Sequence, residues 1–166
     1  IGKSEIGDLG TFLAETILPG VGRSYKNQFP KRTFNNYRKG ELANQVTTVE
    51  GGRCDALLKA IAEGDVVAAY FVCPLQGWSI TADRAQMATL PQQFILAEAI
   101  VGSAGIAMFP DVLARDFNVP GQDLAGNQWQ SAGVSLGFEA HDGYLGFDGR
   151  DLGARDGFSA GLLVLG

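Results

Sequence analysis

The longest apolar stretch of the chain covers residues 94–109, FILAEAIVGSAGIAMF, and contains a single charged residue, Glu98. A stretch this apolar has to be covered by the rest of the molecule, so it predicts the centre of the core. It is shorter than the roughly 20 apolar residues that a membrane-spanning helix needs, and we expect no membrane partner. Because GSAG at 102–105 disfavours a continuous helix, the pattern predicts a buried helix over 94–101 and a short core strand over 106–109.

Two segments with helical spacing precede this core. Residues 6–17 place four apolar side chains on one face and predict a short amphipathic helix: Ile6, Leu9, Leu13 and Ile17. Pro19-Gly20 is expected to end that helix, because proline and glycine both disfavour helical continuation. A second helix is predicted over residues 54–63, ending at Gly64.

Strand patterns flank the second helix. Residues 44–50, NQVTTVE, are rich in β-branched side chains. Residues 66–73, VVAAYFVC, form a continuous apolar run of strand length, which predicts a central strand buried on both faces. Asp83 and Thr89 each precede a Gln by three residues and predict the N-caps of two successive helices. Strand, helices and strand over 66–109 would then form a crossover unit with parallel strands.

The period changes to two after Ser131. Residues 134–140 alternate apolar and polar side chains, Asp142-Gly143 is a strong hairpin signal, and 144–147 and 158–165 complete three successive strands. We therefore predict the α+β class. The expected sheet is mixed or mainly antiparallel, with a C-terminal β-meander and several short helices packed on it.

Charge divides the 166 residues unevenly, although the net charge is only −5. Residues 1–50 carry seven Lys/Arg against five Asp/Glu, whereas residues 51–166 carry six against thirteen. We expect a single domain overall, in which residues 1–50 supply an amphipathic helix and a basic-aromatic arm. Residues 51–166 would form the compact α+β body.

The basic-aromatic segment, residues 21–40, contains six cations and no acid. Its irregular pattern, with Pro30 and Asn35-Asn36, predicts an extended arm or a long ordered loop. Nine of its side chains are the predicted partner-binding residues: Arg23, Lys26, Lys31, Arg32, Arg38, Lys39, Tyr25, Phe34 and Tyr37.

Three uses of this segment stay open. Its cations suit the acidic surface of another copy of the chain, because opposite charges steer association. Cations that alternate with aromatic rings also suit single-stranded nucleic acid, where they neutralise phosphates and stack on bases. Alternatively, the charges are simply solvated and the rings pack locally.

Other candidate sites carry weaker signals. Residues 141–157 offer four acids for calcium, Asp142, Asp148, Asp151 and Asp156. Their spacing does not match the EF-hand calcium loop, and Arg150 and Arg155 are available as ion-pair partners. GSAG follows a helix rather than preceding one, so close packing explains it better than a phosphate loop.

Cysteine chemistry is limited to two residues. Cys73 ends a predicted strand and would need His141, the only histidine, as its base. Whether Cys54 and Cys73 pair is open. Two cysteines and one histidine without paired spacing do not make a zinc site, so we expect no metal and no cofactor.

These observations favour a non-enzymatic structural or assembly subunit of a homo-oligomer, such as a component of a shell, tube or virus-like particle. The basic arm would make its subunit contacts. Two alternatives remain: a small enzyme or ligand-binding domain with a pocket near Cys73, Trp78 and GSAG, and a single-stranded nucleic-acid-binding module through residues 21–40. No feature of the sequence fixes the compartment.

Overall fold

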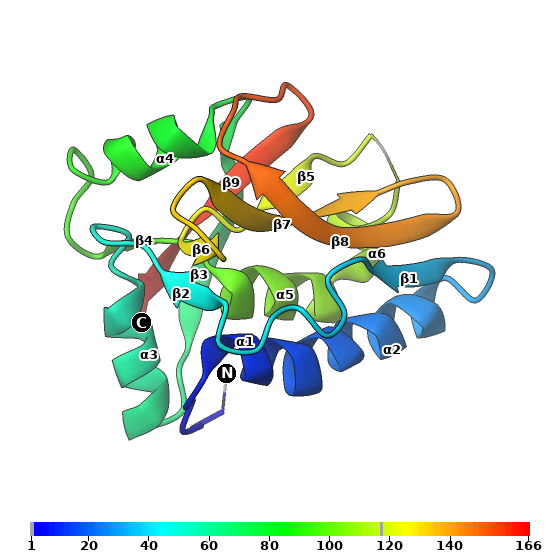
Figure 1. Cartoon of the computed structure of the whole chain (residues 1–166), viewed down its shortest axis with the longest axis horizontal. Helices are drawn as coiled ribbons and strands as arrows, with labels where there is room; N and C mark the ends of the chain where they lie inside the picture. Colours follow the sequence, from blue (N-terminus) through cyan, green and yellow to red (C-terminus); the bar gives the residue numbers. More distant parts are fainter. Residues whose placement is uncertain (1, 117) are drawn as a thin grey trace.

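Seven strands form one mixed sheet in the computed structural model, which describes residues 2–116 and 118–166 (Figure 1). The main path has the order β1-β8-β7-β5-β9-β3, and β4 also pairs with β9. These strands are β1 (Thr33–Asn36), β3 (Ala68–Gln76), β4 (Phe94–Leu96), β5 (Gly121–Asp123), β7 (Val134–Ala140), β8 (Tyr144–Asp151) and β9 (Phe158–Leu165). A separate two-stranded sheet pairs β2 (Val46–Thr48) with β6 (Asn127–Trp129). The predicted α+β class is confirmed.

Helix α5 (Ala99–Met108) is the centre of the fold, and it differs from the prediction for this stretch. The chain forms strand β4 before the helix and continues the helix straight through GSAG. The expected core strand over 106–109 was therefore wrong. Glu98 starts the helix, because its carboxylate accepts the N–H groups of Ile100 and Val101 at 2.8 and 2.9 Å. Burial against the sheet outweighs the cost of two helical glycines.

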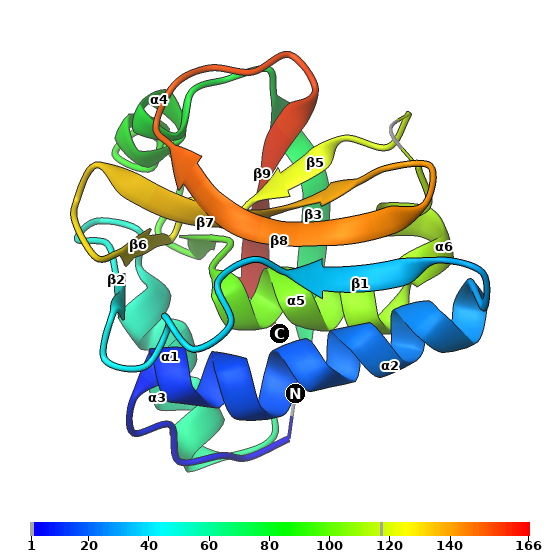
Figure 2. The same ribbon diagram turned by 45° about the vertical axis from the view of Figure 1, so that its right-hand side comes forward.

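The N-terminal helix is also longer than predicted. It runs through α1 (Leu9–Phe12), a π-helical turn η1 (Leu13–Ile17) and α2 (Leu18–Gln28) without interruption. The expected stop at Pro19-Gly20 was wrong. Proline lacks an N–H and crowds the carbonyl one turn earlier, and the wider π turn just before it relieves that crowding. Figure 2 shows α5 between this long helix and the sheet, and α2 packs on α5.

Residues 21–40 are consequently folded onto the body. Residues 21–28 continue α2, and Thr33–Asn36 form β1, which pairs in parallel with β8. The expected extended arm or loop was wrong for this segment. The local sequence pattern did not predict these elements, because α2 continues through Pro19 and β1 pairs with a strand that lies more than 100 residues later in the chain.

Strand β3 lies at one edge of the sheet and pairs antiparallel with β9. The predictions of a central strand and of a parallel crossover unit were therefore wrong. Its exposure alternates, and Phe71 is half exposed. The run is apolar throughout because one face of β3 contacts α5 and the other contacts β4. On the β4 side, the ring centroids of Phe71 and Phe94 lie 6.2 Å apart.

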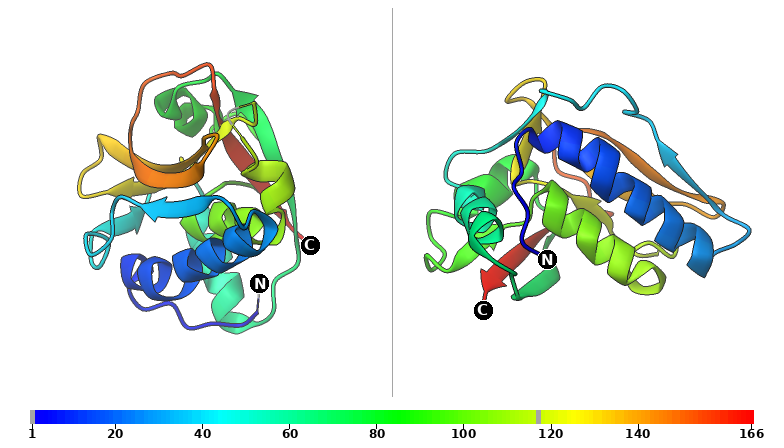
Figure 3. Two further views of the ribbon diagram at one scale, coloured as in Figure 1. Left: turned by 90° about the vertical axis from the view of Figure 1, so that its right-hand side faces the viewer. Right: turned by 90° about the horizontal axis from the view of Figure 1, so that it is seen from below.

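Two shorter helices complete the frame around the sheet. Helix α3 (Cys54–Glu63) forms as predicted, whereas α4 (Ile80–Gln86) begins earlier than expected because Ser79, not Asp83, caps it. Residues 89–92 make turns rather than a second helix. Figure 3 shows the chain from two further sides, with the N-terminal helix and α5 running side by side.

The C-terminal hairpin forms at Asp142-Gly143 as predicted, joining β7 to β8. Strand β9, however, does not lie beside β8. It joins the sheet beyond β5, with which it runs parallel. The last strand thus lies between β5 and β3.

The close approach of the N-terminal helix to the body gives a paired test. Gly10 has no room for a methyl group, because a Cβ there would collide with the Leu42 carbonyl, whereas a Cβ at Gly20 would meet nothing within 4 Å. We expect Gly20→Ala to raise the free energy of unfolding by about 0.5–1 kcal/mol and Gly10→Ala to lower it by about 1–3 kcal/mol. Urea unfolding measures both, and stabilisation by Gly10→Ala would contradict the packing.

Candidate apolar binding site

The nine predicted partner-binding residues do not form one surface. Tyr25 is fully buried, with its ring 5.1 Å from Phe29, so it is a core residue in this fold. Phe34 is half-buried and stacks 6.5 Å from Phe138, which leaves Tyr37 as the exposed ring of the predicted set.

The cations of residues 21–40 also divide into two with ring or ion-pair partners on the body and four that are exposed on the surface. Arg32 lies over the Phe29 ring at 4.9 Å, and Arg38 binds Asp148 and Glu41 and stacks on Trp129. Four cations remain on the surface: Arg23, Lys26, Lys31 and Lys39. Arg32 and Arg38 thus have local partners within the folded body.

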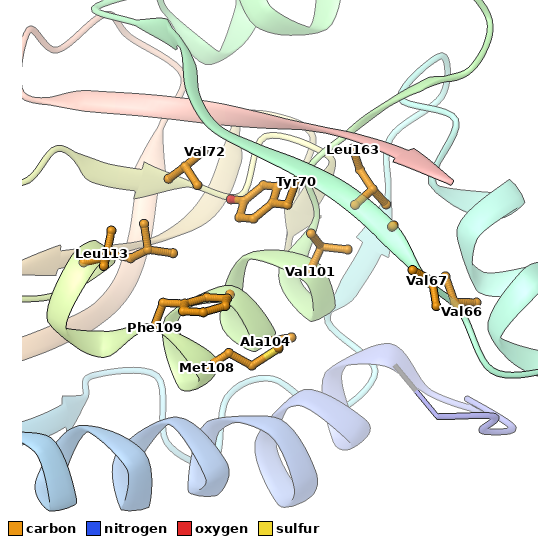
Figure 4. A pocket seen from close by; sticks show the side chains of 13 residues that line it. Val66, Val67, Tyr70, Val72, Val101, Ala104, Met108, Phe109, Leu113 and Leu163 are labelled. Carbon is orange, nitrogen blue, oxygen red and sulfur yellow. The ribbon is translucent and has the colours of Figure 1, made fainter. Parts of the chain in front are cut away.

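A concave feature lies elsewhere, between β3, α5 and the short helix α6 (Pro110–Leu113). It is a half-open groove of about 560 Å³, and Figure 4 shows its lining side chains. We call it the β3–α5 groove. It is lined almost entirely by aliphatic and aromatic groups, and none of its lining residues carries a charge.

Two periodicities direct side chains into the groove. Alternate residues of β3 face α5, namely Ala68, Tyr70 and Val72. From α5 come four residues at positions i, i+3, i+4 and i+7 of one helical face, namely Val101, Ala104, Gly105 and Met108. This spacing was readable in the sequence once the helix is continued through GSAG, but the predicted break there hid it.

Apolar side chains at the rim of the groove stand in solvent. The exposed fractions are 79% for Val67, 69% for Met108, 59% for Val112 and 52% for Phe109. Such a concentration of exposed large apolar groups around one concavity is typical of a binding surface.

Tyr70 supplies the one polar side chain of the lining. Burial raises the pKa of its phenol, and the nearby Cys73 and Glu98 raise it further, so the hydroxyl keeps its proton. The hydroxyl lies 3.4 Å from Oε1 of Gln122, a buried residue of β5.

The predicted cysteine chemistry is not assembled. Cys73 does not line the groove, and its Sγ contacts Nε2 of Gln122 at 3.7 Å. His141 lies at the far hairpin, stacked on Tyr144 and facing Glu139. Because β9 and β5 separate β3 from β7, about three strand spacings of ~4.8 Å lie between the strand that carries Cys73 and the strand that ends just before His141. Cys54 and Cys73 are both free thiols, and Trp78 lies outside the lining.

Two of the four acids proposed for calcium have local partners. Asp148 binds Arg38, and Asp151 binds Arg155 and the N–H of Gly153. Within residues 2–116 and 118–166, no three His, Cys, Asp or Glu residues gather as a metal site. Among the same residues, no helix is both long enough and apolar enough to cross a membrane.

A second polar feature lies on the opposite face of the sheet, under α4. Adjacent residues of a strand face opposite ways, so Gln122 faces α5 while Asp123 faces α4. Asp123 lies 3.4 Å from Arg150, whose guanidinium stacks on Phe158. Asp83 of α4 is fully buried nearby, and neither of its carboxyl oxygens has a hydrogen-bond partner.

Burial raises the pKa of both carboxyl groups, to about 7 for Asp83 and about 6 for Asp123. The Asp123 charge raises the Asp83 pKa further, while Arg84 on the same helix lowers it. Because Asp83 is closed to solvent, we regard this pair as a determinant of stability rather than as a site for a substrate.

Comparison with known proteins adds no functional assignment. No protein-family model, no curated protein and no solved structure matches this chain.

The Asp83 carboxyl predicts an unusual dependence of stability on pH. Between pH ~4 and ~7 the folded chain keeps a proton on Asp83 that the unfolded chain loses, so rising pH lowers stability over this window. Asp83→Asn should therefore stabilise the protein, and its gain should be about 1–3 kcal/mol larger at pH 8 than at pH 5. Denaturant unfolding at the two pH values measures the difference.

Asp142→Asn is the matched control, because it removes the same charge from an exposed turn. We expect its effect to be the same at both pH values. A gain for Asp83→Asn that does not grow with pH would contradict the proposed protonation of Asp83.

Proposed function

We propose that the protein is a binding module for an uncharged, mainly apolar small molecule, held in the β3–α5 groove. The observation that carries this proposal is the concavity of about 560 Å³ with an uncharged apolar lining. Small-molecule sites in proteins typically enclose about 300–1,000 Å³ and combine apolar walls with a few polar groups. The groove fits that description, with Tyr70 as its polar side chain.

The class of ligand follows from the lining. A charged ligand would lose its hydration without gaining an opposite charge or a set of hydrogen bonds, which is costly in an apolar site. The lining supplies apolar contact along β3 and α5 and a single phenol, so it favours a molecule with an extended apolar part. The proposal assigns binding rather than a reaction, because the nearby thiol of Cys73 does not line the groove.

A specific observation also supports the assembly function, through a different surface from the one first expected. The rim residues Val67, Met108 and Val112 line the groove and are also largely exposed to solvent. An uncharged lining can meet a second copy of itself without burying unpaired charge, as a symmetric dimer requires. In this second candidate, the exposed cations of residues 21–40 would make additional contacts with acidic surface on a neighbouring copy.

The nucleic-acid alternative has less support. Base stacking needs exposed aromatic faces, and of the three predicted rings Tyr25 is in the core and Phe34 is half-buried. Four exposed cations and Tyr37 remain as its basis.

Filling the groove tests the principal proposal. The probe is N-phenyl-1-naphthylamine, an uncharged apolar dye whose fluorescence rises when it leaves water. Ala104→Phe places a ring in the concavity and should weaken dye binding about tenfold or more. Ala62→Phe adds the same ring to the exposed face of α3 and should leave binding unchanged. Equal binding by both variants, or no saturable binding by the wild type, would reject the proposal.

Solution mass tests the assembly candidate. Light scattering at low and high salt should give a multiple of 17.6 kDa at both, because an apolar contact is not screened by ions. Met108→Glu should shift the protein to a monomer, whereas Trp78→Glu adds the same charge at an exposed apolar residue outside the groove and should not. A wild-type monomer at both salts would exclude this contact, and an assembly lost only at high salt would favour the cations instead.

A further inference from the structure

The position of the Tyr70 ring in the groove is fixed by two glycines. A Cβ at Gly161 of β9 would collide with the ring, and a Cβ at Gly105 of α5 would lie 3.0 Å from its Cε1. The ring therefore occupies space that side chains from the sheet and from the helix would otherwise fill. Figure 4 shows Tyr70 between Val72 and Val101. Since Tyr70 lines the groove, the place of its hydroxyl relative to a bound molecule is set by the fold.

Gln122 determines how that hydroxyl can bond. Its Nε2 donates to the Pro120 carbonyl at 3.2 Å, which turns Oε1 toward the Tyr70 hydroxyl at 3.4 Å. An amide oxygen only accepts hydrogen bonds, so the Tyr70 O–H donates to it. The raised pKa of Tyr70 keeps that proton in place. The Tyr70 oxygen is then left with accepting capacity only.

We infer that the β3–α5 groove selects an apolar molecule whose polar end is a hydrogen-bond donor, such as a long-chain alcohol, with the Tyr70 oxygen as the acceptor. This inference rests on the proposed binding function and adds the chemistry of the ligand's polar end. A carboxylate or an ether presents only acceptors, and the Tyr70 proton is already committed to Gln122. An alcohol can donate, and its chain can lie against the aliphatic walls.

Two isomers separate the polar end from the rest of the ligand. 1-Decanol and 1-methoxynonane have the same formula and similar length, but only the alcohol can donate. Displacement of N-phenyl-1-naphthylamine from the wild-type protein should favour 1-decanol by about threefold to tenfold, the effect of one net hydrogen bond.

Three variants locate the preference. Tyr70→Phe removes the acceptor and should abolish it, and Tyr144→Phe, on β8 and outside the groove lining, should retain it. Gln122→Met removes the internal acceptor and frees the Tyr70 proton, so the ether should gain and the preference should shrink. Gln122→Met keeps the test informative if Tyr70→Phe is destabilised.

The outcomes distinguish the inference from the function on which it rests. Equal binding of both isomers by the wild type, or a preference that survives in Tyr70→Phe, overturns the inference and leaves apolar binding intact. An unchanged preference in Gln122→Met overturns the role of Gln122. Failure of both isomers to displace the dye overturns the groove as a site for such chains.

Discussion

The capping of an uncharged, mainly apolar helix by one buried carboxyl group is the interaction on which the rest of this structure depends. Glu98 is fully buried and accepts the N–H groups of Ile100 and Val101, while Oδ1 of Asn127 accepts that of Ala99. These N–H groups would otherwise be unpaired in the core at the start of α5. Burial raises the Glu98 pKa to about 7, opposed by the two backbone bonds. The cap thus lets α5 begin inside the protein, and the β3–α5 groove is the part of its surface that neighbouring elements leave open.

Sequence periodicity was sufficient where an element depends on its own residues. Helix α3, the hairpin at Asp142-Gly143 and the α+β class follow from local apolar spacing and turn chemistry. Sequence periodicity failed where contacts between distant parts of the chain determine the secondary structure. GSAG stays helical because most of α5 is buried, and Gly102 and Gly105 leave room for the Leu124 and Tyr70 side chains. Propensity alone cannot include such contacts, since tertiary packing outweighs about 1 kcal/mol per glycine.

The candidate site was within partial reach of the sequence. A pocket near GSAG was among the alternatives, and Val101, Ala104 and Met108 follow a helical stripe that a reader can count. The sequence could not predict that β3 is an edge strand beside α5, because β3 pairs with β9, which lies about ninety residues later in the chain. Likewise, the composition of residues 21–40 shows the cations and aromatic rings, but it does not show which of them face the core and which face solvent. Leu18, Val21 and Tyr25 form the buried stripe of a helix that was predicted to end at Pro19-Gly20.

The most direct test of the apolar binding site is methyl NMR of the wild-type protein titrated with 1-decanol. Intermolecular NOEs should connect the decanol chain to the methyl groups of Val72, Val101 and Leu163, with saturable shifts at these positions. The methyl resonances of Leu75 and Ile80, which belong to the separate apolar cluster that includes α4, should keep their chemical shifts. NOEs that appear only at that second cluster, or shifts that never saturate, would contradict the assignment of the groove as the binding site.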